Sequence, residues 1–225
     1  MWYDNLKPGY PWSSLWYSYL RCLCGGIRQV EGLCPACGSE LWKSEPIPIG
    51  FGDGRERTVP QDIHPGGEGG LEDYVYLDLI EREWKRPVSD ADRVNSFGSV
   101  NPPSPRAAIV ILFWSYFETR IERLLRAGMR DVPPRIAEDL LNRYPAVGAR
   151  IDRLYRILFD TSYRSDLNAL GFDAVGQQLN RVQERRNAFA HGEPQAIDDA
   201  LVEKVVANLK QEHEAWIAVF NRRCR

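Results

Sequence analysis

The sequence contains no long apolar run. No segment reaches the roughly 18 uninterrupted apolar residues that a membrane-spanning helix needs. The opening stretch, MWYDNLKPGYPWSSLW, also lacks the basic segment followed by an apolar block that marks a secretory signal. We therefore expect a cytoplasmic protein with no membrane partner. In a reducing compartment, clustered cysteines are more often metal ligands than disulfides.

The chain also has little net charge and, in its second half, little lysine. The formal net charge is -2. From Arg106 onward there are 17 arginines, 2 lysines and 16 acidic residues, a net of +3, so the first 105 residues carry -5. This balance excludes a general polyanion-binding protein. Arginine favours fixed, planar contacts with carboxylate and phosphate groups, although most helical arginines only form surface ion pairs.

Catalytic signals are scarce. GFGDG at 50–54 begins like a glycine-rich phosphate loop, but no helical pattern follows it, so we interpret it as a turn. Only three histidines are present. His64 lies in a Pro/Gly-rich stretch and His213 in the polar half of the last predicted helix. Neither has a ligand or triad partner nearby in the sequence, so both are expected at the surface.

Four of the five cysteines form one cluster. Cys22, Cys24, Cys34 and Cys37 give the spacing C-x-C-x9-C-x2-C. Two close pairs, each on a tight glycine-containing turn, suit tetrahedral zinc, and four thiolates leave no open position for catalysis. We therefore predict a structural zinc ion in a small four-cysteine module that resembles a zinc ribbon. Cys224 stands alone and is not expected to bind metal.

Composition divides the chain into three parts. Residues 1–44 hold the cysteine cluster and an aromatic-rich segment, whose rings either build a small core or stack on nucleic-acid bases. Residues 45–105 are predicted to be a Pro/Gly-rich linker with one helix over 71–86. Residues 106–225 are predicted to be an all-α domain of four or five helices, with helical patterns over 106–127, 134–144, 146–159, 173–191 and 196–222.

The segment RRNAFAHG at 185–192 ends one of these helices. At about 100° per residue, Arg186 falls in the middle of an apolar stripe of Val175, Leu179, Val182 and Phe189. A second stripe is wholly polar: Asn180, Gln183, Glu184, Asn187 and His191. Arg186 and His191 are about 140° apart on this helix. They converge only through the length of the arginine side chain, through unwinding at Gly192, or across two copies of the helix.

These residues resemble a known motif. Arg186-Asn187-x-x-x-His191, near the end of a helix in an all-α domain, resembles the R-x4-6-H motif of HEPN domains. The run Phe117-Glu118-x-x-Ile121 resembles an early HEPN helix that carries an acidic residue, and Glu118 is the expected carboxylate partner of Arg186. The resemblance covers 106–222. One HEPN subgroup has tyrosine two residues after the histidine, where this chain has Glu193.

The resemblance implies a homodimer that cleaves RNA without a catalytic metal, acting as a toxin or an anti-phage defence effector with an antitoxin or activator partner. The residue types suit that chemistry. The RNA 2′-OH would be the internal nucleophile, His191 the acid or base, and Arg186 the cation that stabilises the phosphorane-like transition state. Asn187 would orient the histidine or bind the phosphate. The products would be 2′,3′-cyclic phosphate and 5′-OH ends.

Three other interpretations remain open at this point. The first is a non-catalytic HEPN-like dimerisation protein whose zinc ribbon recruits nucleic acid or a protein. The second is a zinc-ribbon nucleic-acid binder with the helical half as a scaffold. The third is a plain helix end, because a histidine there is favoured by the helix dipole alone.

Overall fold

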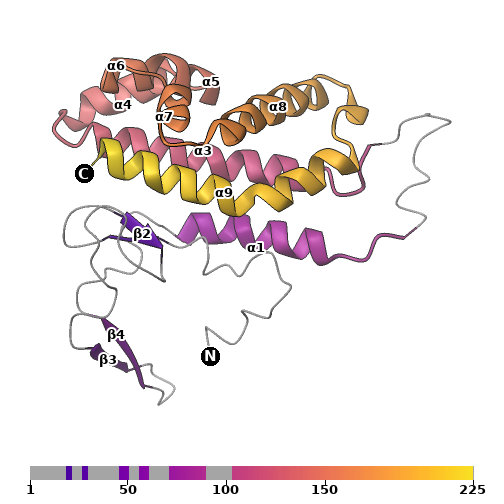
Figure 1. The fold of residues 1–225 in the computed structure, drawn as a ribbon, viewed down its shortest axis with the longest axis horizontal. Coiled ribbons are helices and arrows are strands. Elements are labelled where there is room, and N and C mark those ends of the chain that lie inside the picture. The colour runs from indigo at the N-terminus through magenta and orange to yellow at the C-terminus, as the bar shows by residue number, and fades with distance from the viewer. Residues whose placement is uncertain are drawn as a thin grey trace.

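A computed structural model describes residues 19–21, 27–29, 46–50, 56–60, 71–89 and 103–224. This part of the chain is mainly helical, as the sequence predicted. In Figure 1, α3 and α9 lie side by side in the middle of the helical domain, with α1 along one side and the shorter helices and α8 along the other. The core lies between these layers.

The helices follow the predicted periodic segments closely. Three helical elements were not predicted: the short helix α7, the 3-10 turn η3, and a π-helical turn, η2, inside the 146–159 segment. The described helical elements are α1 (Leu71–Lys85), α3 (Ala108–Gly128), α4 (Pro134–Arg143), α5 (Val147–Ala149), η2 (Arg150–Leu154), α6 (Tyr155–Phe159), α7 (Tyr163–Ala169), α8 (Asp173–Ala190), the 3-10 turn η3 (Pro194–Ala196) and α9 (Asp199–Arg223).

Two antiparallel hairpins precede the helices. β1 (Tyr19–Arg21) pairs with β2 (Ile27–Gln29), and β3 (Pro46–Gly50) pairs with β4 (Glu56–Pro60). The second hairpin lies in the stretch interpreted as linker or loop, so that interpretation is wrong for its two strands. Prolines and glycines had obscured the strand pattern there, and the paired Pro46 and Pro60 sit at the outer end of the ladder, where a missing N–H is tolerated.

The helix α3 forms the centre of the core. One face of this helix is buried along its whole length, from Ile109 to Leu125, while Ile111 and Leu112 are partly buried. α1 packs against α3, and Leu77 and Ile80 of α1 belong to the same core. The single helix of the segment 45–105 is therefore part of the helical domain's packing.

A buried arginine connects α3 to α9. The guanidinium carbon of Arg120 lies 4.5 Å from the Tyr116 ring centroid and 4.7 Å from that of Trp216. Its Nη2 lies 2.7 Å from Nδ1 of His213, and the Trp216 indole donates to the Arg120 carbonyl oxygen at 3.0 Å. The prediction that His213 lies at the surface is wrong, because its side chain is fully buried.

A second polar contact fixes the far end of α9. Asp166 of α7 is buried and accepts hydrogen bonds from Tyr155 and Arg223. Burial by itself would raise the pKa of Asp166, but the hydrogen bonds from Arg223 and Tyr155 and the nearby positive charges lower it below its ordinary value. The charged form of Asp166 therefore ties α6 and α7 to the last turn of α9.

The described helices include none that is both long enough and apolar enough to cross a membrane.

The buried histidine predicts a pH-dependent stability. An arginine can only donate, so Nδ1 of His213 accepts and the ring is neutral. Burial, and secondly the charge of Arg120, hold the pKa of His213 well below its ordinary value. The unfolded chain binds this proton near pH 6.5. The contribution of neutral His213 to the free energy of unfolding is therefore complete above pH 6.5. It is lost as the pH falls toward the lowered pKa, by up to about 1.4 kcal/mol per pH unit.

Urea unfolding of wild type at pH 7, 6 and 5 checks this expectation. His213→Gln keeps an acceptor for Arg120 but cannot be protonated in this range, so its free energy of unfolding should change less with pH. The matched control is His191→Gln, which removes an exposed histidine and should keep the wild-type pH dependence. If the free energy of unfolding changed equally with pH in His213→Gln and in wild type, the assignment of His213 as a buried neutral histidine would be wrong.

Candidate functional site

The predicted site residues lie on and beside α8. The buried residues of this helix are Val175, Gly176, Gln178, Leu179 and Val182, all in its first half or at its middle. Beyond Val182 every residue is at least partly exposed, although Phe189 still packs against the core. The apolar stripe predicted from the sequence therefore faces the core, and the Arg186-to-His191 end of the helix is accessible to a ligand.

A glycine ends α8 directly after His191. Gly192 has a φ of +97°, and its N–H donates to the Phe189 carbonyl while the Glu193 N–H donates to the Ala188 carbonyl. These two bonds define a Schellman cap. The His191 N–H still bonds to the Asn187 carbonyl at 3.0 Å, so the helix is intact up to the histidine. Unwinding at Gly192 does not bring His191 around the helix toward Arg186.

Arg186 bonds to its neighbour rather than to His191. Its Nη1 donates to Oδ1 of Asn187 at 3.1 Å. Asn187 and His191 are both exposed and lie one turn apart on the same side of α8. Within the described chain, no hydrogen bond joins Arg186 to His191. The cap at Gly192 excludes unwinding as a way to bring Arg186 and His191 together. Within one chain, the two groups lie on different faces of α8.

The expected pair of Arg186 with Glu118 does not form in a single chain. Glu118, 39% exposed, instead lies 3.9 Å from Nη1 of Arg150, whose own side chain is only 11% exposed. Arg150 makes a closer ion pair with Glu122 at 3.0 Å. The prediction failed because Arg150 lies on η2, which packs directly on α3. No local spacing in the sequence indicates that pairing.

The segment that carries Arg150 also braces α8. A Cβ placed on Gly148 would lie 2.8 Å from Nε2 of Gln183, so this backbone closely approaches α8 one turn before Asn187. Arg150 holds the segment itself by donating to the Tyr144 carbonyl at 2.9 Å. π-helical turns often occur near functional sites. Here the segment just before the turn lies close to the helix that carries the motif.

The predicted zinc ligands, Cys22, Cys24, Cys34 and Cys37, lie outside the described residues. Within the described ranges, no group of histidine, cysteine and acidic residues could hold a metal. Cys224 is buried, and its thiol donates to the Leu124 carbonyl at 3.5 Å. The flanking strands are nevertheless informative. β1 and β2 pair with Arg21 opposite Ile27, so the connection that contains Cys22 and Cys24 joins two antiparallel strands. β2 also contacts α9.

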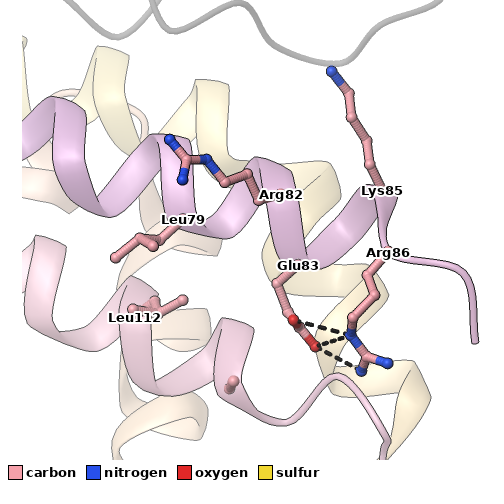
Figure 2. Close-up of a pocket in the computed structure, with 7 residues that line it drawn as sticks. Leu79, Arg82, Glu83, Lys85, Arg86 and Leu112 are labelled. Carbon is pink, nitrogen blue, oxygen red and sulfur yellow. Dashed lines mark hydrogen bonds and ion pairs between the residues drawn. The ribbon is translucent and has the colours of Figure 1, made fainter.

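An open groove lies between α1 and α3, away from these residues (Figure 2). It has a volume of about 560 Å³, and Leu79, Ala108 and Leu112 supply its apolar part. Its charged residues pair within α1 and just beyond it: Arg86 binds Glu83 at 2.8 Å, and Lys85 binds Glu81. None of the predicted site residues line the groove, so it is not the candidate site.

Comparison with known proteins finds no matching family model, no matching curated protein and no matching solved structure.

The cap of α8 can be tested with a pair of glycine substitutions. Gly192→Ala places a Cβ in open space but on a backbone of positive φ, so it should destabilise the protein by about 1 kcal/mol. The control is Gly176→Ala, inside α8, where the new Cβ meets Leu167 and Arg164 at ordinary contact distances of 3.6 and 3.7 Å. It should be neutral or stabilising by roughly 0.5–1 kcal/mol.

Thermal or urea unfolding of both variants measures these differences. Equal effects of the two substitutions would contradict the assignment of Gly192 to a cap that requires the left-handed conformation.

Proposed function

We propose that this protein is a metal-independent RNA endonuclease of the HEPN type, with an N-terminal zinc-ribbon module. The observation that carries the proposal is the end of α8. There, Arg186, Asn187 and His191 follow one another over a turn and a half of a capped helix, and both Asn187 and His191 are exposed. A mainly helical domain around this motif is also what the resemblance requires.

The side chains present can supply the chemistry of 2′-OH attack. A histidine accepts or donates a proton near neutral pH without help from its surroundings. His191 caps the carboxyl end of α8, a position where the helix dipole favours a positive charge. Arg186 supplies a guanidinium that can bind two phosphate oxygens at once, and its Nη1 donates to Oδ1 of Asn187.

A second copy of the chain would complete the site. Arg186 lies on the core side of α8 and His191 on the opposite side, so one chain does not present both to the same phosphate. A symmetric pair of α8 ends, related by a two-fold axis, would place the Arg186 of one chain near the His191 of the other. Phe189, the partly exposed member of the apolar stripe at this end of α8, supports such a contact.

The biological role follows from the activity and from the resemblance. An endonuclease that cuts cellular RNA needs control, so a toxin or an anti-phage effector regulated by an antitoxin or activator protein is the role we propose. The four-cysteine module would hold structural zinc and recruit RNA or that partner. Its four thiolates would leave the metal no part in the cleavage step.

Cleavage of a mixed RNA pool in EDTA tests the proposed activity. Wild type should cut RNA and leave 2′,3′-cyclic phosphate and 5′-OH ends, while DNA of the same sequences, which lacks the 2′-OH, should stay intact. His191→Ala should lower the rate by about 100-fold or more. Arg186→Ala should have an effect of similar size.

The matched control is His64→Ala, which removes the same residue type elsewhere in the chain and should cleave like wild type. Light scattering on each protein measures the oligomeric state. A folded dimer that leaves RNA intact would favour the non-catalytic interaction protein. Full activity in a protein that stays monomeric would contradict the two-chain site.

Metal analysis tests the zinc module separately. The purified protein should contain about one zinc ion per chain, and Cys34→Ser should lose it because three thiolates hold zinc far more weakly than four. Cys224→Ser, which changes the isolated cysteine, should retain the full zinc content. Equal zinc in both variants, or no zinc in wild type, would contradict the assignment of the four cysteines as zinc ligands.

A further inference from the structure

The strands β1 and β2, which we call the N-terminal hairpin, lie against the last helix of the protein. β2 contacts α9, and Figure 1 shows it near the carboxyl-terminal half of α9, on the side away from α8. Each of the two strands has three residues. An isolated two-stranded hairpin is at best marginally stable in water. Strands as short as these therefore need other contacts to persist.

The side of α9 that faces the hairpin is buried. Asn208 faces α8, where its amide bonds to Gln178. Trp216 faces α3, where its indole donates to the Arg120 carbonyl oxygen. At about 100° per residue, Ile217 lies opposite to Asn208 and about 100° from Trp216. Ile217 is nevertheless only 4% exposed. On that side of α9, Figure 1 shows α1 and, beside the carboxyl-terminal half, the N-terminal hairpin.

The connection of the same hairpin contains two of the predicted zinc ligands. The ladder ends with Arg21 opposite Ile27, so the connecting residues 22–26 have the sequence CLCGG and include Cys22 and Cys24. These cysteines lie outside the described residues, and only their place in the sequence is used. Metal binding to a small module contributes directly to the free energy of its folding. The hairpin would therefore be stabilised from two sides, by zinc at its connection and by α9 at its second strand.

We propose that zinc binding by the four-cysteine module is linked to the packing of α9, so that loss of the metal loosens the carboxyl-terminal half of this helix. A ligand that stabilises the docked hairpin also stabilises the contact on which the hairpin docks, and such coupling is reciprocal. The affected half of α9 carries His213 and Trp216, which meet Arg120 of α3. The inference rests on the zinc module of the proposed function, but not on the nuclease activity.

Hydrogen–deuterium exchange of the full chain tests the link. Zinc-loaded protein is compared with protein from which a strong chelator has removed the metal, and zinc content is measured in both samples. Backbone amides of residues 212–223 in α9 should exchange at least about five-fold faster without zinc. Those of α4, which Figure 1 shows on the far side of α3 and α9 from the hairpin, should exchange equally in both samples. Chelator already saturated with zinc should change neither, and added zinc should restore slow exchange.

A substitution in α9 tests the link in the reverse direction. Ile217→Val removes one buried methylene group from the side of α9 near the hairpin, and it should weaken zinc binding by about three-fold. Competition with a chelator of known affinity measures this change. The matched control is Ile109→Val, at a buried isoleucine in the first turn of α3. It should leave the zinc affinity unchanged, because the first turn of α3 lies at the other end of the helix pair from the hairpin.

The possible failures are distinguishable. If zinc is fully removed and exchange in α9 does not change, the inference is wrong and the zinc site stands, because the module then folds independently of the helices. Equal zinc affinities of Ile217→Val and Ile109→Val would also overturn it. A wild-type protein that contains no zinc would remove both the zinc site and the inference. RNA cleavage enters none of these measurements, so the nuclease proposal is decided separately.

Discussion

The packing of α9 on α3 depends on the burial of one cation. Arg120 is enclosed by the rings of Tyr116 and Trp216, and it donates to a neutral His213. A buried guanidinium is costly unless aromatic faces and acceptors replace the water it loses. Only one register of α9 along α3 supplies all of these groups together. The rest of the helical domain is arranged around the helix pair that this contact fixes.

The position of the motif helix follows from that pair. α8 lays its first half, with Leu179 and Val182, on the core that α3 and α9 form, and α9 begins soon after the cap at Gly192. The segment before the π-helical turn adds a brace where Gly148 approaches Gln183. The first half of α8 is packed on the core and its end is capped. The polar side chains of its second half can therefore point to solvent without partners from their own chain. Such a capped and exposed helix end is accessible to a ligand.

Charge is used in two ways in this protein. Buried or half-buried charged groups join elements, as Asp166 does for α7 and α9, or as Arg150 does for η2 and α3. Several exposed charges pair along their own helix, as Asp139 does with Arg143 and Lys210 with Glu214.

The regular spacing of apolar residues predicted most of the helices, because a helix that is buried on one face carries apolar residues at helical intervals. It also placed Arg186 on the core side of α8 and His191 on the polar side. Position 213 carried a similar signal, since His213 follows Leu209 by four residues and precedes Phe220 by seven, within the apolar stripe of its helix. Only the tertiary structure decided the partners. Arg120 meets His213 across 93 positions of sequence, and Glu118 meets Arg150 rather than Arg186. Such pairs depend on which helices pack together, and no local pattern encodes that choice.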